Sequence, residues 1–452
     1  MILENIILGS GPSGLSYALL SDKKIKILER NNYPGGHASS FQIKDFTFDY
    51  GPHILFSKDK DILNFILKTL KNNVARCKRK NFISYKKKLI KYPFENDLGS
   101  LEPKENFDCL IDILQNPYKI KYANPKNMRE WFLKYFGKSI CEKYLFPYNR
   151  KVWNIDPKNM SMSWSERIPK PPLKDIIRSS LGIPTEGYKH QLYYHYPKKG
   201  GYQAICNNWS RNSDVDYNET VVHLEKKRKY FEIHTKKKIY KSQKVISTIS
   251  LNDLVKIYKV PIKIKNLVNK LIINPMYVVS LAIQGNDKNK FTALYFPEKE
   301  FLFNRVSFPK TFSNFNCPKN TYSIQAEITF RANSKLKNIS KKKIINHVIK
   351  GLKKNKILEK NHKILFTDIK SCKESYVVYD KNYEKRIKII RNFFKRQGID
   401  LLGRFSYFEY INIDMAVERS VKLICENNKK KFSNNLKRNL LKRALKKFND
   451  YN

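Results

Sequence analysis

Residues 2–29 read ILENIILGSGPSGLSYALLSDKKIKILE. An apolar run ends in a glycine turn, an apolar helix follows, and a second apolar run ends at Glu29. Gly9 permits the tight turn, Gly11 lets the backbone approach a pyrophosphate, and Gly14 lets the helix pack on the strand. A carboxylate at Glu29 would accept hydrogen bonds from a ribose. The spacing predicts a βαβ unit that binds a dinucleotide, with its pyrophosphate at the start of the helix.

A second glycine pair follows Glu29 within six residues, in the run Gly35-Gly36-His37-Ala38-Ser39-Ser40. This pair resembles the two-glycine motif of FAD enzymes in the amine-oxidase and protoporphyrinogen-oxidase superfamily, which domains that bind only NAD do not usually carry. The residues from Phe48 to His53 form a strand that enters a tight turn, and the resemblance implies that this turn lies close to a flavin ring. We therefore assign Gly35, Gly36, Ser39 and His53 to the cofactor site.

The composition is that of a globular chain with two or three domains. Among 452 residues, 41% are hydrophobic, and no apolar run reaches the roughly 18 residues of a membrane helix. The first residues carry no basic segment, which argues against a signal peptide. Seven cysteines stand singly and eight histidines show no metal-ligand spacing. We therefore expect no metal site, no disulfide framework and a cytoplasmic location.

The formal net charge of +49 is extreme. It could indicate nucleic-acid binding, but the lysines are spread along the whole chain, so biased composition is the better interpretation and we expect no nucleic-acid partner. The basic, partly amphipathic stretch 429–447 predicts a terminal helix. Peripheral contact with an anionic membrane is an alternative to an ordinary solvated helix there.

The periodicity predicts an α/β fold with a Rossmann-like FAD-binding domain, a helical lobe and an antiparallel β-sheet substrate domain. Residues 1–75, 191–255 and 396–452 are assigned to the FAD-binding domain, the last including the basic helix. Residues 76–190 are assigned to a mainly helical lobe, and 256–395 to the sheet domain.

Individual elements are predicted from spacing. Helices are expected at 58–71, 342–352 and 383–394, and a hairpin at 81–90. Alternating residues predict antiparallel strands at 277–283, 292–296, 301–307 and 322–330, followed by strands at 364–369 and 375–378. Asp414 is expected to cap a final helix, 415–424.

Further motifs make the resemblance more specific. They are Gly51-Pro52-His53-Ile54-Leu55-Phe56-Ser57, Lys91-Tyr92-Pro93-Phe94-Glu95-Asn96, Pro147-Tyr148-Asn149-Arg150-Lys151-Val152-Trp153, Trp164-Ser165-Glu166-Arg167, Tyr196-Pro197-Lys198-Lys199-Gly200-Gly201 and Gly403-Arg404-Phe405 leading to Tyr410 and Asp414. Their order and joint presence resemble the UDP-galactopyranose mutase family, in its eukaryotic-type branch and bacterial relatives. Where the family would place a tyrosine after Arg305, this sequence has Ser307-Phe308-Pro309.

The resemblance implies an FAD enzyme that interconverts UDP-galactopyranose and UDP-galactofuranose for cell-surface polysaccharide synthesis. In that family the reduced flavin N5 attacks the anomeric carbon and expels UDP, the sugar opens as an adduct and recloses, and UDP returns. The partners implied are a nucleotide-sugar substrate and an external electron donor such as NAD(P)H. The sequence leaves the oligomeric state, the sugar and the nucleotide open.

The resemblance also implies site residues. Arg167 and, less securely, Arg305 match arginines that hold the diphosphate, and a planar guanidinium suits that task. A surface arginine is the alternative for each. His53 matches a histidine beside the flavin, although a lone histidine is more often structural. We take Arg167, Arg305 and His53 as the catalytic candidates.

The remaining assignments concern the walls of the site. Tyr376 and Tyr410 would donate hydroxyls to the diphosphate, although a core role is nearly as plausible for these aromatic residues. The residues assigned to substrate binding are Tyr92, Asn149, Trp153, Tyr376 and Tyr410. Arg404 and Asp414 match the flavin end, where the following helix would direct its positive end at the flavin N1–C2=O edge. Val221 completes the cofactor assignments, which otherwise comprise Gly9, Gly11, Gly14, Glu29, Gly35, Gly36, Ser39, His53, Arg404 and Asp414.

Two other function classes stay open. An FAD-dependent oxidoreductase of the same superfamily, such as an amine oxidase, protoporphyrinogen oxidase or desaturase, would take hydride from its substrate and need no arginines for a diphosphate. A non-catalytic flavin- or nucleotide-binding module would have a closed, apolar cavity. The position of Arg167 and Arg305 relative to the flavin distinguishes these alternatives.

Overall fold

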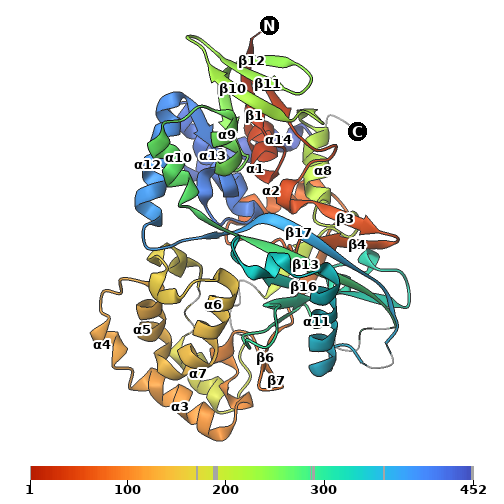
Figure 1. Cartoon of the computed structure of the whole chain (residues 1–452), viewed down its shortest axis with the longest axis vertical. Helices are drawn as coiled ribbons and strands as arrows, with labels where there is room; N and C mark the ends of the chain where they lie inside the picture. The colour runs from red at the N-terminus through yellow and green to blue at the C-terminus, as the bar shows by residue number, and fades with distance from the viewer. Residues whose placement is uncertain are drawn as a thin grey trace.

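The computed structural model describes residues 2–168, 170, 172–186, 192–285, 287, 291–359 and 362–448. Its nucleotide-binding part lies at the top of Figure 1, a helical lobe at the lower left, and a larger sheet between and beside them. Three segments far apart in the sequence build the nucleotide-binding part, and their strands form one sheet.

The nucleotide-binding sheet is parallel around its first strand. Its order is β10 (Val221–Lys226), β11 (Phe231–Thr235), β12 (Ile239–Ser247), β1 (Leu3–Leu8), β2 (Ile25–Leu28) and β9 (Asp214–Asp216), with β18 (Ile399–Leu401) beside β12. Strand β1 pairs in parallel with β12 and β2, and β12 with β18, while β10, β11 and β12 form an antiparallel meander. The predicted Rossmann-like unit is therefore confirmed.

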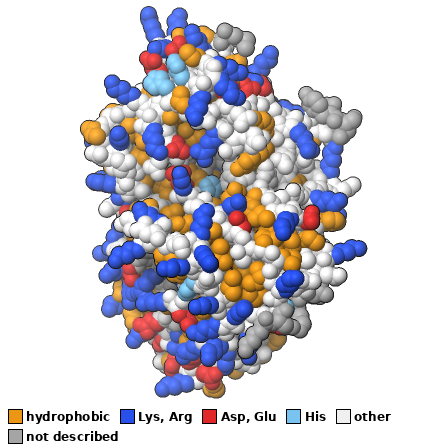
Figure 2. All heavy atoms as spheres, turned by 45° about the vertical axis from the view of Figure 1, so that its right-hand side comes forward, with side chains coloured by type: hydrophobic (Ala, Val, Ile, Leu, Met, Phe, Trp, Pro, Cys, Tyr) orange, Lys and Arg blue, Asp and Glu red, His pale blue; other side chains and the backbone are white. Residues whose placement is uncertain are grey.

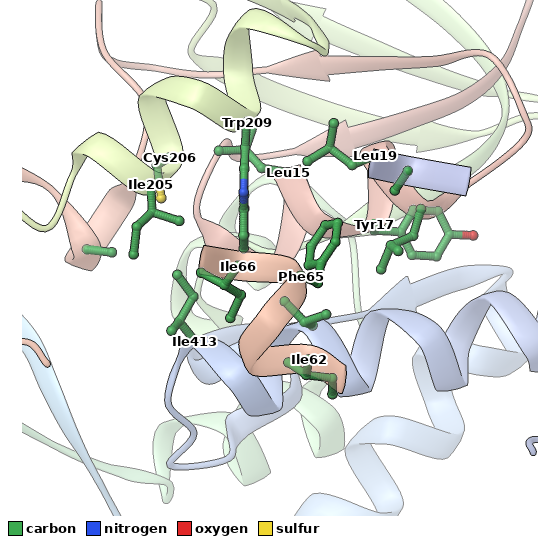
Figure 3. Close-up of a cluster of buried hydrophobic side chains, with 14 of the residues drawn as sticks. Leu15, Tyr17, Leu19, Ile62, Phe65, Ile66, Ile205, Cys206, Trp209 and Ile413 are labelled. Atoms are coloured by element: carbon green, nitrogen blue, oxygen red, sulfur yellow. The ribbon is translucent and has the colours of Figure 1, made fainter. Parts of the chain in front are cut away.

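Helices cover this sheet and bury one apolar core. Leu15 and Tyr17 from α1 (Pro12–Leu20) meet Phe65 from α2 (Lys60–Leu70), Trp209 from α8 (Ala204–Arg211) and Ile413 from α13 (Ile413–Asn427) (Figure 3). Helix α14 (Asn434–Lys446) adds its apolar face to the same core. Helices α9 (Leu251–Ile257), α10 (Ile262–Asn269) and α12 (Tyr383–Gln397) follow on the other side of the sheet.

The larger sheet runs in the order β17 (Ile364–Val378), β13 (Ile272–Gln284), β16 (Thr321–Thr329), β15 (Arg305–Ser307), β14 (Ala293–Tyr295), β6 (Asn81–Tyr85) and β7 (Lys88–Lys91). The predicted antiparallel sheet is confirmed, with one exception, because β14 pairs with β6 in parallel. The predicted strands 364–369 and 375–378 are one continuous strand, β17. Helix α11 (Lys341–Lys354) packs against this sheet.

The helical lobe comprises α3 (Pro103–Leu114), α4 (Tyr118–Lys121), α5 (Met128–Ile140), a π-helical turn (Cys141–Leu145), α6 (Phe146–Trp153) and α7 (Leu173–Ser180). Its core is aromatic and includes Trp131, Phe132, Phe136 and Phe146. Short strand pairs join the lobe to the rest: β5 (Ala75–Lys78) with β8 (Tyr193–Tyr196), beside the hairpin β3 (Ser40–Ile43) and β4 (Phe46–Asp49).

On the face drawn in Figure 2, basic side chains are spread out and do not form a single stripe. Lys and Arg lie among acidic side chains and several apolar areas, the largest of them right of the centre. The apolar residues of the basic helix α14 are already buried in the core, and its Lys437 pairs with Asp59 at the start of α2. Within the described residues, no helix combines the length and apolar character needed to span a membrane.

A buried carboxylate, Asp49, links segments that are far apart in the sequence. Asp49, at the end of β4, accepts hydrogen bonds from Ser40 Oγ (2.6 Å), Tyr196 Oη (2.8 Å) and the Tyr202 backbone N–H (3.1 Å). Burial raises the pKa of Asp49 to about 6, in spite of these donors. This carboxylate joins the β3–β4 hairpin to the segment that leads into α8.

The raised pKa predicts a pH dependence of stability. The folded-state pKa of about 6 exceeds the ordinary value of 3.8, so the folded state binds the proton more tightly. Stability due to Asp49 should therefore fall as pH rises from about 4 to about 6, by about 3 kcal/mol. Asp49→Asn should flatten this slope in urea-unfolding measurements across that range. Asp45→Asn, on the exposed turn of the same hairpin, should keep the wild-type slope. An unchanged slope in Asp49→Asn would contradict the assignment.

Candidate functional site

A cavity of about 670 Å³ lies where the nucleotide-binding part, the helical lobe and the larger sheet meet. One side is formed by the glycine turn after β1, and the opposite side by strands of the larger sheet and by Arg167 of the lobe. Of the residues predicted for the site, those that line this cavity are Gly9, Gly11, Glu29, Gly36, His53, Tyr92, Arg167, Val221, Arg305, Tyr376, Arg404 and Tyr410.

The glycine turn leaves space for a ligand above it. A Cβ built on Gly11 meets nothing within 4 Å, whereas one on Gly14 would lie 2.3 Å from Gly9 O. Gly11 therefore borders open space, and Gly14 packs against the turn. Helix α1 has no side-chain cap, so its first N–H groups point at the place where a pyrophosphate would bind.

Glu29 lies at the end of β2, as the spacing predicts. Its carboxylate accepts from Ser10 N–H (2.9 Å), Ser10 Oγ (2.8 Å) and Asn31 N–H (2.9 Å). A carboxylate has about four acceptor sites, and Oε2 takes two of these bonds and Oε1 one, so an acceptor site on Oε1 is left for a ribose hydroxyl. Val221, at the start of β10, lines the cavity on the same side.

Two predicted cofactor residues lie beneath the lining. Gly35 has φ +115° and donates its N–H to Ser10 O at 2.9 Å, so it shapes the second glycine turn. Ser39 is buried, and its Oγ donates to Gly36 O at 2.6 Å. Both hold Gly36 at the cavity wall, where a Cβ would meet only Gly11 Cα at 3.7 Å.

The other end of this side carries two histidines. His53 and His37 are both partly buried, and this burial, reinforced by Arg404, lowers the pKa of each to about 3. Both are therefore neutral at physiological pH. His53 stacks on Tyr202, and its Nδ1 is buried with no protein partner among the described residues. A ligand with a polar edge at this position would satisfy that nitrogen.

Helix α13 begins at the same end. Asn412, Ile413 and Ala416 line the cavity, and the N-cap residue Asn412 makes no side-chain capping bond. The free N–H groups of this helix start therefore face the cavity, as expected for a flavin N1–C2=O edge. The prediction that Asp414 is the N-cap is wrong, because the helix begins two residues earlier than predicted, at Ile413 with Asn412 as N-cap, and Asp414 lies within its first turn. Asp414 is not among the cavity-lining residues.

These features fit a dinucleotide carrying a flavin. The turn at Gly11 would hold the pyrophosphate, and Glu29 would bind a ribose. His53 Nδ1, together with the start of α13, would bind the polar edge of the flavin ring. Arg404 fixes the segment that precedes α13, because its Nη2 and Nε donate to Ile411 O at 2.6 and 3.1 Å.

Arg167 enters the cavity from the helical lobe. Its Nη1 donates to Tyr410 O, and its guanidinium lies 5.0 Å from the Tyr410 ring and 5.5 Å from the Trp164 ring. No carboxylate of the described residues forms an ion pair with it. Burial lowers the pKa of Arg167 from its ordinary value, so an anion bound beside it would stabilise its charge.

Arg305 is paired differently. Its Nη2 lies 2.8 Å from both carboxylate oxygens of Glu327, and its Nε donates to Glu327 Oε2 at 3.0 Å. Burial alone would lower the pKa of Arg305, but Glu327 raises it well above the ordinary value. Arg305 Nη2 also donates to Tyr376 Oη at 3.3 Å. Much of the Arg305 fork is therefore occupied by protein, in contrast to Arg167.

The two arginines are joined through aromatic side chains. Tyr376 stacks on Tyr410 with ring centroids 5.6 Å apart, so the contacts run from Arg167 through Tyr410 and Tyr376 to Arg305. The structure thus brings both predicted arginines and both predicted tyrosines to one wall of one cavity.

The other predicted substrate residues divide into two groups. Tyr92 lines the cavity, with its ring 4.9 Å from that of Tyr295. Asn149 and Trp153 are buried behind the wall instead, where Trp153 Nε1 donates to Asn149 Oδ1 at 3.1 Å. Trp153 supports the wall, since its ring packs edge-on against Tyr376 and Tyr410, both at 5.7 Å.

Charges of opposite sign line the two sides. On the nucleotide-binding side the acids Glu29, Glu219, Asp253 and Glu374 outnumber the bases Arg30, Lys256 and Arg404. On the opposite side Arg79, Arg167 and Arg305 face one acid among the described lining residues, Glu327. The side with the arginines is therefore suited to a polyanionic ligand.

Several lining residues escaped the sequence-based prediction. They are His37, Arg79, Asn81, Tyr202, Tyr295 and Glu327. His37 could have been found, because it follows Gly36 directly. The others have no local signal, since only the pairing of distant strands brings them to the cavity.

The comparisons with known proteins agree on the fold. Residues 7–69 match the NAD(P)-binding Rossmann-like domain family. A dTDP-fucopyranose mutase from Escherichia coli is 26% identical over 199 residues, which cover 40% of this chain and 51% of that protein. The match thus spans about half the length of that relative.

Two solved structures resemble the whole chain. A reduced UDP-galactopyranose mutase superimposes with a TM-score of 0.88 at 21% identity, covering 98% of this chain and 99% of that one. A putative protoporphyrinogen oxidase from Exiguobacterium sp. 255-15 gives a TM-score of 0.73 at 16% identity, covering 94% and 98%. The predicted resemblance is thus confirmed at the level of the fold: the chain has the fold of UDP-galactopyranose mutase.

The two glycines of the turn yield a prediction that separates binding from folding. Gly11→Ala adds a methyl group to open space at a φ of −71° that alanine accepts, so the thermal stability of the cofactor-free protein should be unchanged. Retention of FAD, measured by absorbance after gel filtration, should fall strongly. Gly14→Ala should destabilise the protein itself, because its Cβ would collide with Gly9 O. Normal flavin retention by Gly11→Ala would contradict the proposed pyrophosphate position.

Proposed function

We propose that this protein is an FAD-dependent nucleotide-sugar mutase that interconverts the pyranose and furanose forms of a nucleoside-diphosphate hexose. UDP-galactose is the first candidate substrate. The reduced flavin, when bound, supplies the nucleophilic nitrogen that displaces the nucleoside diphosphate. An external donor such as NAD(P)H would reduce it.

One observation carries this proposal. Arg167 and Arg305 reach the same cavity from different domains, on the side opposite the dinucleotide turn, and Tyr376 and Tyr410 lie between them. A mutase must hold a diphosphate in place while it leaves and returns, and buried cationic and phenolic donors suit that need. An oxidase with an apolar substrate has no use for such a group of arginines.

The chain contributes binding and orientation to the reaction. Arg167 has unoccupied donors and would carry most of the developing diphosphate charge. Arg305, fixed by Glu327 through Nε and Nη2, would contribute the N–H donors of Nη1 from a set position. The neutral His53 could donate or accept one hydrogen bond at the flavin edge but would not act as an imidazolium acid, because its pKa is about 3.

The names of the similar proteins suggest two substrates to compare. One is a UDP-galactopyranose mutase and the other a dTDP-fucopyranose mutase. Their substrates share a pyrimidine nucleoside diphosphate and differ in the base, in the pentose (ribose or deoxyribose) and in the hexose. The furanose product would serve a glycosyltransferase of cell-surface polysaccharide synthesis.

The test is an anaerobic conversion assay. The purified holoenzyme is reduced with dithionite and incubated with UDP-galactofuranose or dTDP-fucofuranose, and the products are separated by chromatography. Pyranose product from either substrate, formed only by the reduced protein, would support the proposal. Bound flavin with no conversion of either substrate and no binding of UDP or dTDP would overturn it.

Arg305 pairs with a carboxylate and Arg167 does not, so we expect substitution of the two arginines to have different effects. Arg167→Ala should lower kcat/KM by roughly 10²–10³-fold, because it removes charged, buried donors from the leaving group. Arg305→Ala should also impair the enzyme but should destabilise it as well, because Glu327 would be left as a buried, unpaired carboxylate. Arg178→Ala, on the exposed side of α7, serves as the control and should behave as wild type. Full activity of Arg167→Ala would contradict its assigned role.

A further inference from the structure

A row of polar side chains crosses the larger sheet on its cavity face. Glu327 on β16 lies opposite Arg305 on β15, which lies opposite Tyr295 on β14. Strand β6 then pairs with β14 in parallel, with Asn81 opposite Ala293. Since alternate residues of a strand share one face, Asn81 and Tyr295 are on the same face, and all four polar residues line the cavity.

Asn81 has one polar atom without a partner. The residue is only 8% exposed, and its Nδ2 donates to Tyr295 Oη at 3.0 Å. Its Oδ1 is buried and accepts no hydrogen bond from the described residues. Buried side-chain oxygens nearly always have a partner, and leaving one unpaired costs free energy.

The protein groups nearest in the sheet are engaged elsewhere. The Tyr92 N–H donates to the Asn81 backbone carbonyl at 3.0 Å, and the Thr292 N–H donates to Lys80 O at 2.9 Å. The Tyr295 hydroxyl oxygen is held by Asn81 itself. The Tyr92 and Tyr295 rings, 4.9 Å apart, form an aromatic wall beside the free oxygen.

We propose that Asn81 Oδ1 accepts a hydrogen bond from the substrate and is a specificity-determining residue. This inference rests on the proposed function. The partner is a hydrogen-bond donor of the nucleotide sugar, either a hydroxyl of the hexose or a donor of the nucleoside, namely a ribose hydroxyl or the pyrimidine imide N–H. Tyr295 is the positioning residue, because its hydroxyl fixes the orientation of the Asn81 amide. A substrate lacking this donor leaves the buried oxygen unpaired and is disfavoured.

The test compares Asn81→Ala with a matched control, using the holoenzyme. Asn316 is also a buried asparagine, 1% exposed, whose Nδ2 donates to Pro309 O at 2.9 Å and whose Oδ1 is unpartnered. It does not line the cavity, so Asn316→Ala reports the structural cost of losing such a residue. Flavin content and thermal stability of each variant show that it is folded. If Asn81→Ala does not fold, the nearly isosteric Asn81→Leu replaces it.

Two measurements separate the two sources of the donor: the Kd of UDP by calorimetry and the KM of UDP-galactose. A rise of about tenfold in both for the Asn81 variant, with Asn316→Ala unchanged, places the donor on the nucleoside. A rise of about tenfold in the KM of UDP-galactose, with the Kd of UDP unchanged, places the donor on the hexose. Wild-type Kd and KM in a folded Asn81 variant would overturn the inference. If the wild-type enzyme uses only the dTDP sugar, the same two constants are measured with dTDP and dTDP-fucose. Failure of the wild-type enzyme to bind either UDP or dTDP and to turn over either nucleotide sugar would instead overturn the proposed function, and the inference with it.

Discussion

The ion pair of Arg305 and Glu327 connects the two sides of the cavity. Glu327 is 1% exposed and lies so close to the turn after β4 that a Cβ on Gly51 would come within 2.6 Å of its Oε1. The same carboxylate holds the Arg305 guanidinium through several contacts. The turn that carries His53 and the arginine expected to face the diphosphate are therefore fixed relative to one another. A buried pair of this kind contributes to geometry more surely than to stability.

This pairing also explains why Arg305 and Arg167 would contribute differently to the binding of a diphosphate. Arg305 is close to neutralised by Glu327, whereas Arg167 has aromatic neighbours and a carbonyl but no carboxylate among the described residues. A diphosphate that enters the cavity would thus meet one fixed arginine and one whose charge is uncompensated. The acids on the opposite side are kept apart from this region, near the glycine turn.

Local sequence signals were sufficient for the nucleotide-binding part of the fold. The glycine spacing, the end of β2 at Glu29 and the helical periodicity of α2 all act within a few tens of residues. The hairpin of β6 and β7 was also predictable, although its turn uses Lys86 and Lys87 at φ +49° and +64° in place of glycine or asparagine. Asp414 was misplaced by two residues, because Asn412 is an equally good cap and the apolar pattern does not distinguish them.

The rest of the site depends on strand register, which the sequence does not state. Asn81 lies more than two hundred residues before Tyr295 and Glu327, and each of the three resembles any other polar residue in a strand. They meet because β6, which precedes the helices of the lobe, pairs in parallel with β14. Family resemblance supplied Arg167 and Arg305, but it did not reveal that Glu327 occupies one of them. Asn149 and Trp153 matched a motif and nevertheless lie behind the cavity wall.

In the proposed complex, the two arginines hold a nucleoside diphosphate across the cavity from the flavin. The most direct measurement is a crystal structure of the protein with bound FAD and UDP. We expect the UDP phosphate oxygens to lie within about 3 Å of donors on both Arg167 and Arg305, with the flavin along the Gly11 side. A UDP diphosphate bound outside this cavity, or contacting neither arginine, would contradict it.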